Sequence, residues 1–163
     1  MATTVYALAT SSAVGVDLVA GNSEDGNVLL RNRGGQFERH VLPGGRPDTK
    51  AAAVGDLNGD GLDDIIFGGW PNVSLTMLRN DGRGFVAVVL PGMPKHDGSN
   101  ASWTEALALA DVDGDGDLDL LVGNNEEPNY LLRNDGVAGF APGVLLPGSP
   151  TLVTGALAVG DVN

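Results

Sequence analysis

The chain has 163 residues and no cysteine, which excludes disulfides, thiolate metal sites and a cysteine nucleophile. Its formal net charge is −12, with 21 Asp and Glu against 9 Lys and Arg, which argues against nucleic acid as a partner. The 25 glycines and 9 prolines interrupt every apolar period of 3.6 residues, so we expect many short strands and no long helix.

Neither a signal peptide nor a membrane span is expected from the apolar segments. Residues 1–4 lack a basic region followed by an apolar core, so they do not have the pattern of a signal peptide. No apolar run approaches the roughly 20 residues that a membrane-spanning helix takes. We therefore expect no membrane insertion.

In chain order, the first predicted elements are four short strands within residues 5–45. A small apolar strand at 5–9 is followed by a strand at 17–22, a strand that ends at Leu29-Leu30-Arg31-Asn32, and a strand from Phe37 to Leu42-Pro43-Gly44. The same order returns in residues 51–92 and again in residues 104–148. A partial fourth unit at 156–163 starts with one extra strand, at 156–160.

The repeat is clearest at a Leu-Arg-Asn triplet that ends at Asn32, Asn80 and Asn134, so that successive copies lie 48 and 54 residues apart. This period is typical of propeller blades rather than of helical repeats. Asn-Asp-Gly at 80–82 and 134–136 predicts tight hairpins after the third strand. The prediction is an all-β fold of β-propeller blades, each of four antiparallel strands, with three blades plus one extra strand per chain.

Two acidic loops interrupt the second and third units. Residues 56–64 read DLNGDGLDD and residues 111–119 read DVDGDGDLD, so that 9 of the 21 acidic residues lie in them (four and five, respectively). Oxygen-bearing side chains at alternate positions of a tight loop converge on one point, and glycine at the sixth position permits the turn. Such an oxygen cage suits a hard cation, above all Ca²⁺.

The acidic pattern, followed by an apolar strand that ends in Phe-Gly or Val-Gly, resembles the FG-GAP/VCBS β-propeller repeats. These repeats are known from integrin α-subunit heads and from many bacterial secreted proteins, and the resemblance covers residues 5–163. It implies a non-catalytic, structural or protein-interaction module from an extracellular or secreted parent. It also implies that each acidic loop binds one Ca²⁺, about two per chain.

The resemblance further implies a ligand set: positions one, three, five and nine of the loop, and the backbone carbonyl of position seven. Carried onto this chain, the ligands of the two sites are Asp56, Asn58, Asp60, Leu62 (carbonyl) and Asp64, and Asp111, Asp113, Asp115, Asp117 (carbonyl) and Asp119. In the first unit only Asp17 of residues 11–17 matches a ligand, and we expect no ion there. Asp161 and Asn163 match positions one and three of a further loop.

Three blades and one strand do not close a ring, so we expect self-association into a homodimer or another closed ring. The alternative is that these residues are part of a longer chain.

Two other functions stay open, namely a carbohydrate-binding propeller lectin and a propeller-type hydrolase or lyase fragment. A protein ligand would fit the interaction module, and a glycan ligand would fit the lectin. Trp70 and Trp103 lie at strand ends and do not recur, which favours surface packing over sugar stacking. Arg31, Arg79 and Arg133 recur at one blade position, which favours a shared structural contact.

Overall fold

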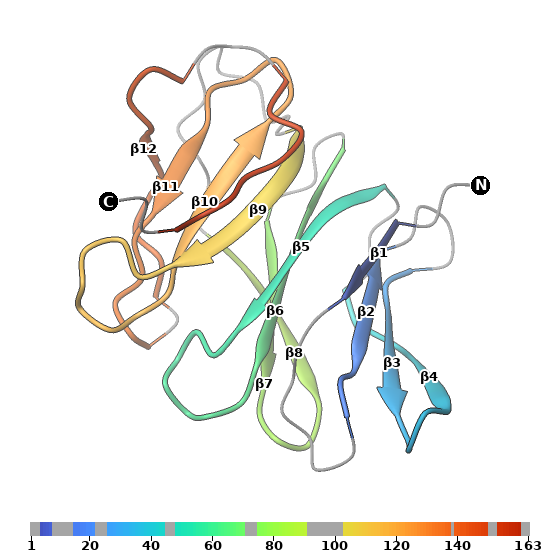
Figure 1. Cartoon of the computed structure of the whole chain (residues 1–163). Helices are drawn as coiled ribbons and strands as arrows, with labels where there is room; N and C mark the ends of the chain where they lie inside the picture. Colours follow the sequence, from blue (N-terminus) through green and yellow to red (C-terminus); the bar gives the residue numbers. More distant parts are fainter. Residues whose placement is uncertain are drawn as a thin grey trace.

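The computed structural model describes residues 4–7, 15–21, 26–44, 48–70, 75–90, 103–137, 139–149 and 153–160. Within these ranges the chain forms three antiparallel sheets of four strands each, and no helix (Figure 1). A helix able to cross a membrane is accordingly not found in them. The predicted fold class of four-stranded antiparallel units is confirmed, while closure into a ring stays a prediction.

We call the three sheets blades one, two and three, and in each the strands follow one another in chain order. Blade one consists of β1 (Thr4–Ala7), β2 (Leu18–Gly21), β3 (Val28–Asn32) and β4 (Phe37–Val41). Blade two consists of β5 (Thr49–Gly55), β6 (Asp64–Gly69), β7 (Thr76–Asn80) and β8 (Phe85–Val89). Blade three consists of β9 (Thr104–Ala110), β10 (Asp119–Asn124), β11 (Tyr130–Leu132) and β12 (Val144–Leu145).

The second and third strands of every blade pair in the same register. The equivalent pairs are Leu18–Leu30 and Val19–Leu29, Ile65–Leu78 and Ile66–Met77, and Leu120–Leu132 and Leu121–Leu131. Because successive side chains of a strand point to opposite faces of the sheet, the two pairs of one blade lie on opposite faces. Each blade therefore has two apolar faces. We call the face on the side of earlier blades in the chain the preceding face, and the face on the side of later blades the following face.

Two apolar cores result, one at each junction between blades. The core between blades one and two holds Val19, Leu29, Leu42, Ile65, Phe67 and Leu78. The core between blades two and three holds Leu57, Ile66, Leu75, Met77, Leu90, Leu120, Val122, Tyr130, Leu132 and Phe140. Blade two is thus packed on both faces, whereas the described neighbours of blades one and three cover one face each.

A glycine near the end of the second strand lets the blades approach closely. A Cβ on Gly68 would lie 2.6 Å from Cγ2 of Thr104, the first residue of β9 in the next blade. The same relation returns at Gly123, where a Cβ would lie 2.8 Å from Cγ2 of Thr154. The glycine of the Phe-Gly dipeptide is therefore required by a contact with the next blade, and that of the Val-Gly dipeptide by a contact with the segment that follows blade three.

The first strands of blades two and three, β5 and β9, begin two residues before the predicted starts at 51 and 106, because Thr49 and Thr104 also pair with the adjoining strand. Residues 153–160 form no strand, although the Thr154 amide donates a 2.9 Å hydrogen bond to the Asn124 carbonyl. A strand needs a neighbouring strand, and the described residues supply none for this segment. Asp161 and Asn163 lie outside the described residues.

Candidate metal centre

The two acidic loops connect equivalent strands, since residues 56–63 join β5 to β6 and residues 111–118 join β9 to β10 (Figure 1). Each loop folds around its first aspartate. In blade three, Asp111 Oδ1 accepts hydrogen bonds from the amides of Gly114 at 2.7 Å and Asp115 at 3.2 Å. Its Oδ2 accepts from Gly116 at 3.0 Å. The glycines take positive φ angles of 80° and 98°, which side chains rarely adopt.

The blade-two loop has the same internal hydrogen bonds. Asp56 Oδ1 accepts from the amides of Gly59 at 2.8 Å and Asp60 at 3.2 Å, and Asp56 Oδ2 accepts from Gly61 at 2.8 Å. The third position here is Asn58, whose side-chain oxygen accepts from the Asp60 amide at 3.0 Å. Hydrogen bonds from backbone amides to the carboxylate of the first aspartate thus hold both loops in the same conformation.

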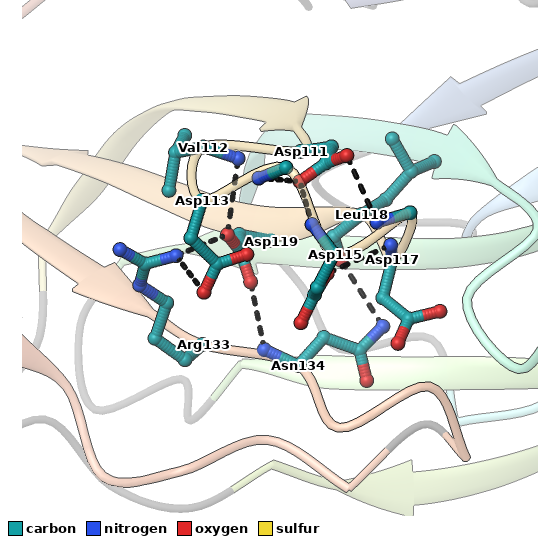
Figure 2. Close-up of polar contacts among 11 residues, drawn as sticks. Asp111, Val112, Asp113, Asp115, Asp117, Leu118, Asp119, Arg133 and Asn134 are labelled. Atoms are coloured by element: carbon teal, nitrogen blue, oxygen red, sulfur yellow. Dashed lines mark hydrogen bonds and ion pairs between the residues drawn. The ribbon is translucent and has the colours of Figure 1, made fainter.

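In blade three this conformation brings three carboxylates together. One oxygen from each of Asp111, Asp113 and Asp115 lies within 4.8 Å of the other two, and all three side chains are exposed (Figure 2). Every possible metal-ligand atom in the cluster is a carboxylate oxygen, which matches the ligand preference of Ca²⁺ and not that of Zn²⁺. The residues present therefore fit a hard divalent cation.

The ninth loop position points inward. Asp64 and Asp119 are fully buried, and Oδ1 of each accepts a hydrogen bond from the backbone amide of the repeat asparagine, Asn80 at 2.7 Å and Asn134 at 2.9 Å. Oδ2 of each accepts from the amide of the second loop residue, at 3.3 Å and 3.2 Å respectively. This aspartate ties the start of the loop to the end of the third strand.

Blade one keeps this hydrogen bond without the acidic loop. Asp17 Oδ1 accepts from the Asn32 amide at 2.7 Å. The Asn32 side chain in turn donates to the Val16 carbonyl at 3.3 Å. The sequence pattern predicted only a metal-ligand role for the ninth position, and this structural role was missed. The signal for it was the presence of Asp17 in a loop with no other acidic residue.

Negative charge accumulates in both loops. Burial raises the pKa of Asp64, and the neighbouring Asp60 and Asp56 raise it further against two backbone hydrogen bonds that lower it. Partial desolvation raises the pKa of Asp117, followed by the charges of Asp115 and Asp111. A bound cation would relieve this repulsion.

One basic side chain enters the blade-three loop. Arg133 Nη1 makes an ion pair with Asp113 Oδ2 and lies 3.2 Å from Asp119 Oδ2 (Figure 2). Among the described residues, Arg31 and Arg79 make no such ion pair and are exposed. The ion pair with the third loop position is therefore particular to blade three, where that position is an aspartate, and a contact shared by all three arginines stays a prediction.

Of the predicted ligands, the structure groups Asp111, Asp113 and Asp115. The ninth-position aspartates belong to the hydrogen bonds described above. The ligand roles of the remaining predicted positions, including the carbonyls of Leu62 and Asp117, stay predictions.

The blade-three repeat asparagine also links the blades. Asn134 Nδ2 donates to the carbonyl of Leu57 in the blade-two loop at 2.9 Å and to that of Leu118 at 3.1 Å. Leu57 itself is buried in the core between blades two and three. The blade-two loop is consequently held by its own blade and by the next one.

The two tryptophans contact each other across the same junction. The rings of Trp70, after β6, and Trp103, before β9, stack with centroids 5.1 Å apart. Lys50 Nζ lies 5.4 Å from the centroid of the Trp70 ring. The two indoles of adjacent blades thus pack against each other.

A family model described as FG-GAP-like repeat matches the chain three times, at residues 15–67, 56–122 and 111–163. Each acidic loop lies where two successive matches overlap, so one repeat runs from the loop region of one blade to the next. No curated protein matches the chain.

Proposed function

The chain belongs to the FG-GAP-like repeat family, and we propose that it is a non-catalytic, calcium-binding β-propeller module for structural and protein-interaction use. The observation that carries the calcium assignment is the convergence of Asp111, Asp113 and Asp115 in a loop that hydrogen bonds already hold closed. The Asp56 loop has the same backbone conformation, with Asn58 in place of one carboxylate.

In this proposal the cation neutralises the loop and thereby fixes the connection between the first two strands of the blade. Asp111, Asp113 and Asp115 would hold it in blade three, and Asp56, Asn58 and Asp60 in blade two. Since a metal that binds only the folded chain stabilises it by mass action, Ca²⁺ raises the free energy of unfolding. A structural role is supported by the blade-two loop, which also anchors the junction through Leu57 and the hydrogen bond that its carbonyl accepts from Asn134.

Calorimetric titration with calcium chloride, paired with thermal melts in calcium and in EDTA, tests this function. We expect about two ions per chain, one for each acidic loop, and a melting temperature that falls on chelation. Asp111→Asn and Asp56→Asn should each remove one ion. An unchanged melt in EDTA together with no binding heat would contradict the calcium assignment.

Self-association is the second part of the proposal, and the two outer blade faces support it. On the following face of blade three, Leu121 and Leu131 are only half-buried, whereas their equivalents Ile66 and Met77 are fully buried at the next junction. Val112 is 39% exposed there, against 1% for its equivalent Leu57. This face carries the side chains of a blade junction, and no blade among the described residues covers them.

The preceding face of blade one has the complementary set. Leu18 and Leu30 are half-buried, although their equivalents in blades two and three are buried. Phe37 is 49% exposed, against 8% for its equivalent Phe140. Because these two faces are of the kinds that already pack together within the chain, a second copy can cover both head to tail, which gives about six blades.

Sedimentation equilibrium tests the assembly. We expect twice the 16.6 kDa of one chain. Leu121→Asp and Leu30→Asp should each weaken the dimer, whereas an equimolar mixture of the two variants should recover association through the one intact junction. Val137→Asp, at a position 74% exposed on the hairpin, is the matched control. A stable monomer for the wild type at all concentrations would rule out self-association of this chain.

A further inference from the structure

We propose that Arg133 is an internal counter-ion of the loop 111–119, which competes with the cation for Asp113 and so lowers the Ca²⁺ affinity of blade three. This inference rests on the proposed calcium site. It concerns a residue outside the loop and outside the ligand set, and it predicts a difference between two loops whose backbones are alike.

The position of Arg133 is fixed by its neighbours. It directly follows β11, and the next residue, Asn134, donates its backbone amide to Asp119 Oδ1 at 2.9 Å. The other oxygen of Asp119, Oδ2, lies 3.2 Å from Arg133 Nη1. Asp119 therefore holds both the backbone and the side chain of this segment against the loop (Figure 2).

From there the guanidinium reaches the third loop position, where Nη1 makes its ion pair with Asp113 Oδ2. Asp113 is one of the three converging carboxylates. An oxygen engaged by a guanidinium is less available to a metal, since both cations are attracted by the same charge and repel each other. Calcium binding must therefore weaken or displace this ion pair.

Blade two provides a natural comparison. Arg79 holds the position of Arg133 but is exposed, and in the described ranges it makes no ion pair with the loop 56–64. The third loop position is the neutral Asn58. Blade three thus has one more carboxylate in its loop, five against four, and one arginine that offsets it.

The two loops therefore differ in how their negative charge is neutralised. In blade three the arginine neutralises part of the charge before any metal arrives, so the loop is less dependent on calcium for its stability. In blade two no side chain of this kind is present among the described residues, and the cation has no internal competitor. We expect the two loops to fill in sequence as calcium rises.

The test is calcium chloride calorimetry in the Asp56→Asn background, which leaves loop 111–119 as the binding site. Arg133→Gln should bind Ca²⁺ about fivefold more tightly than the background chain, the size expected for loss of a half-exposed ion pair. Arg133→Met is the second charge-removing variant, since it keeps an apolar stem if Gln perturbs folding. Arg79→Gln is the matched control and should leave the affinity unchanged.

A second readout follows from the same competition. In EDTA, Arg133→Gln should melt at a lower temperature than the background chain, and saturating calcium should reduce the difference. Affinity that is unchanged or weaker in both Arg133 variants would overturn the role of Arg133 while leaving the calcium site intact. Absence of any calcium binding by the wild-type chain would overturn both.

Discussion

The carboxylate of Asp17 accepts a 2.7 Å hydrogen bond from the backbone amide of Asn32, in a blade whose loop lacks the other acidic residues of the pattern. The same bond joins Asp64 to Asn80 and Asp119 to Asn134, at 2.7 Å and 2.9 Å. It is therefore the feature common to all three blades, and the acidic loop is an addition present in two of them.

Asp17→Ala should lower the free energy of unfolding by roughly 1–2 kcal/mol, because the Asn32 amide loses its acceptor. Urea denaturation should show the same loss in calcium and in EDTA, since we expect no ion in blade one. Asp17→Asn keeps an acceptor oxygen and should cost less. A loss seen only in calcium would instead place an ion at Asp17.

Gly68→Ala should destabilise the junction between blades two and three by about 1–3 kcal/mol, the usual range for overpacking. The added Cβ would lie 2.6 Å from Cγ2 and 2.9 Å from Cβ of Thr104. Thr104→Ser removes the first contact and keeps the hydroxyl that donates to Asn124, so it should rescue part of the loss. Gly84→Ala, with no atom within 4 Å of the added Cβ, is the control and should be neutral by denaturation.

Leu57→Ala should cost about 2–5 kcal/mol, as expected for truncating a buried leucine. The side chain is 1% exposed in the core between blades two and three. Val112→Ala, at the same position of the other loop, removes a side chain that is 39% exposed and should have a much smaller effect on the unfolding of a single chain. Equal losses in urea denaturation at low protein concentration would contradict this difference in packing.

Tyr130 should make the fold sensitive to high pH. Burial raises the pKa of its phenol, and the Glu127 charge raises it further. A raised pKa means that the neutral form is favoured in the folded chain, so the contribution is complete below the unfolded value of about 10 and is lost as the pH rises through the folded value. Melting temperatures should fall above pH 10 in the wild type and fall less steeply in Tyr130→Phe.

Much of the fold follows from the repeat. The spacing of Asn32, Asn80 and Asn134 predicts the units, and alternation of apolar residues predicts their strands. Hydrogen-bonded turns of Asn-Asp-Gly recur in the structure, since the Asp81 side chain accepts from the Gly84 amide at 2.8 Å and the Asp135 side chain from the Gly139 amide at 2.8 Å. Local signals were sufficient for these elements because each unit repeats them.

The candidate site was predictable only in part. Loop spacing indicates the convergence of Asp111, Asp113 and Asp115, since it depends on neighbouring residues. The inward role of Asp119 and the ion pair of Arg133 depend on how the third strand returns to the loop, 14 or more residues later. Likewise Leu57 and Val112 look alike in sequence, and their different burial depends on whether another blade covers them.

The contact of Gly68 with Thr104, repeated by Gly123 with Thr154, bears on how the number of repeats in such a chain can increase. A unit with the glycine on its second strand and the threonine at its beginning carries both partners of this contact, so a duplicated unit brings both with it. Duplication of a unit therefore reproduces this glycine–threonine contact at the new boundary, so blade number can change while that contact is preserved.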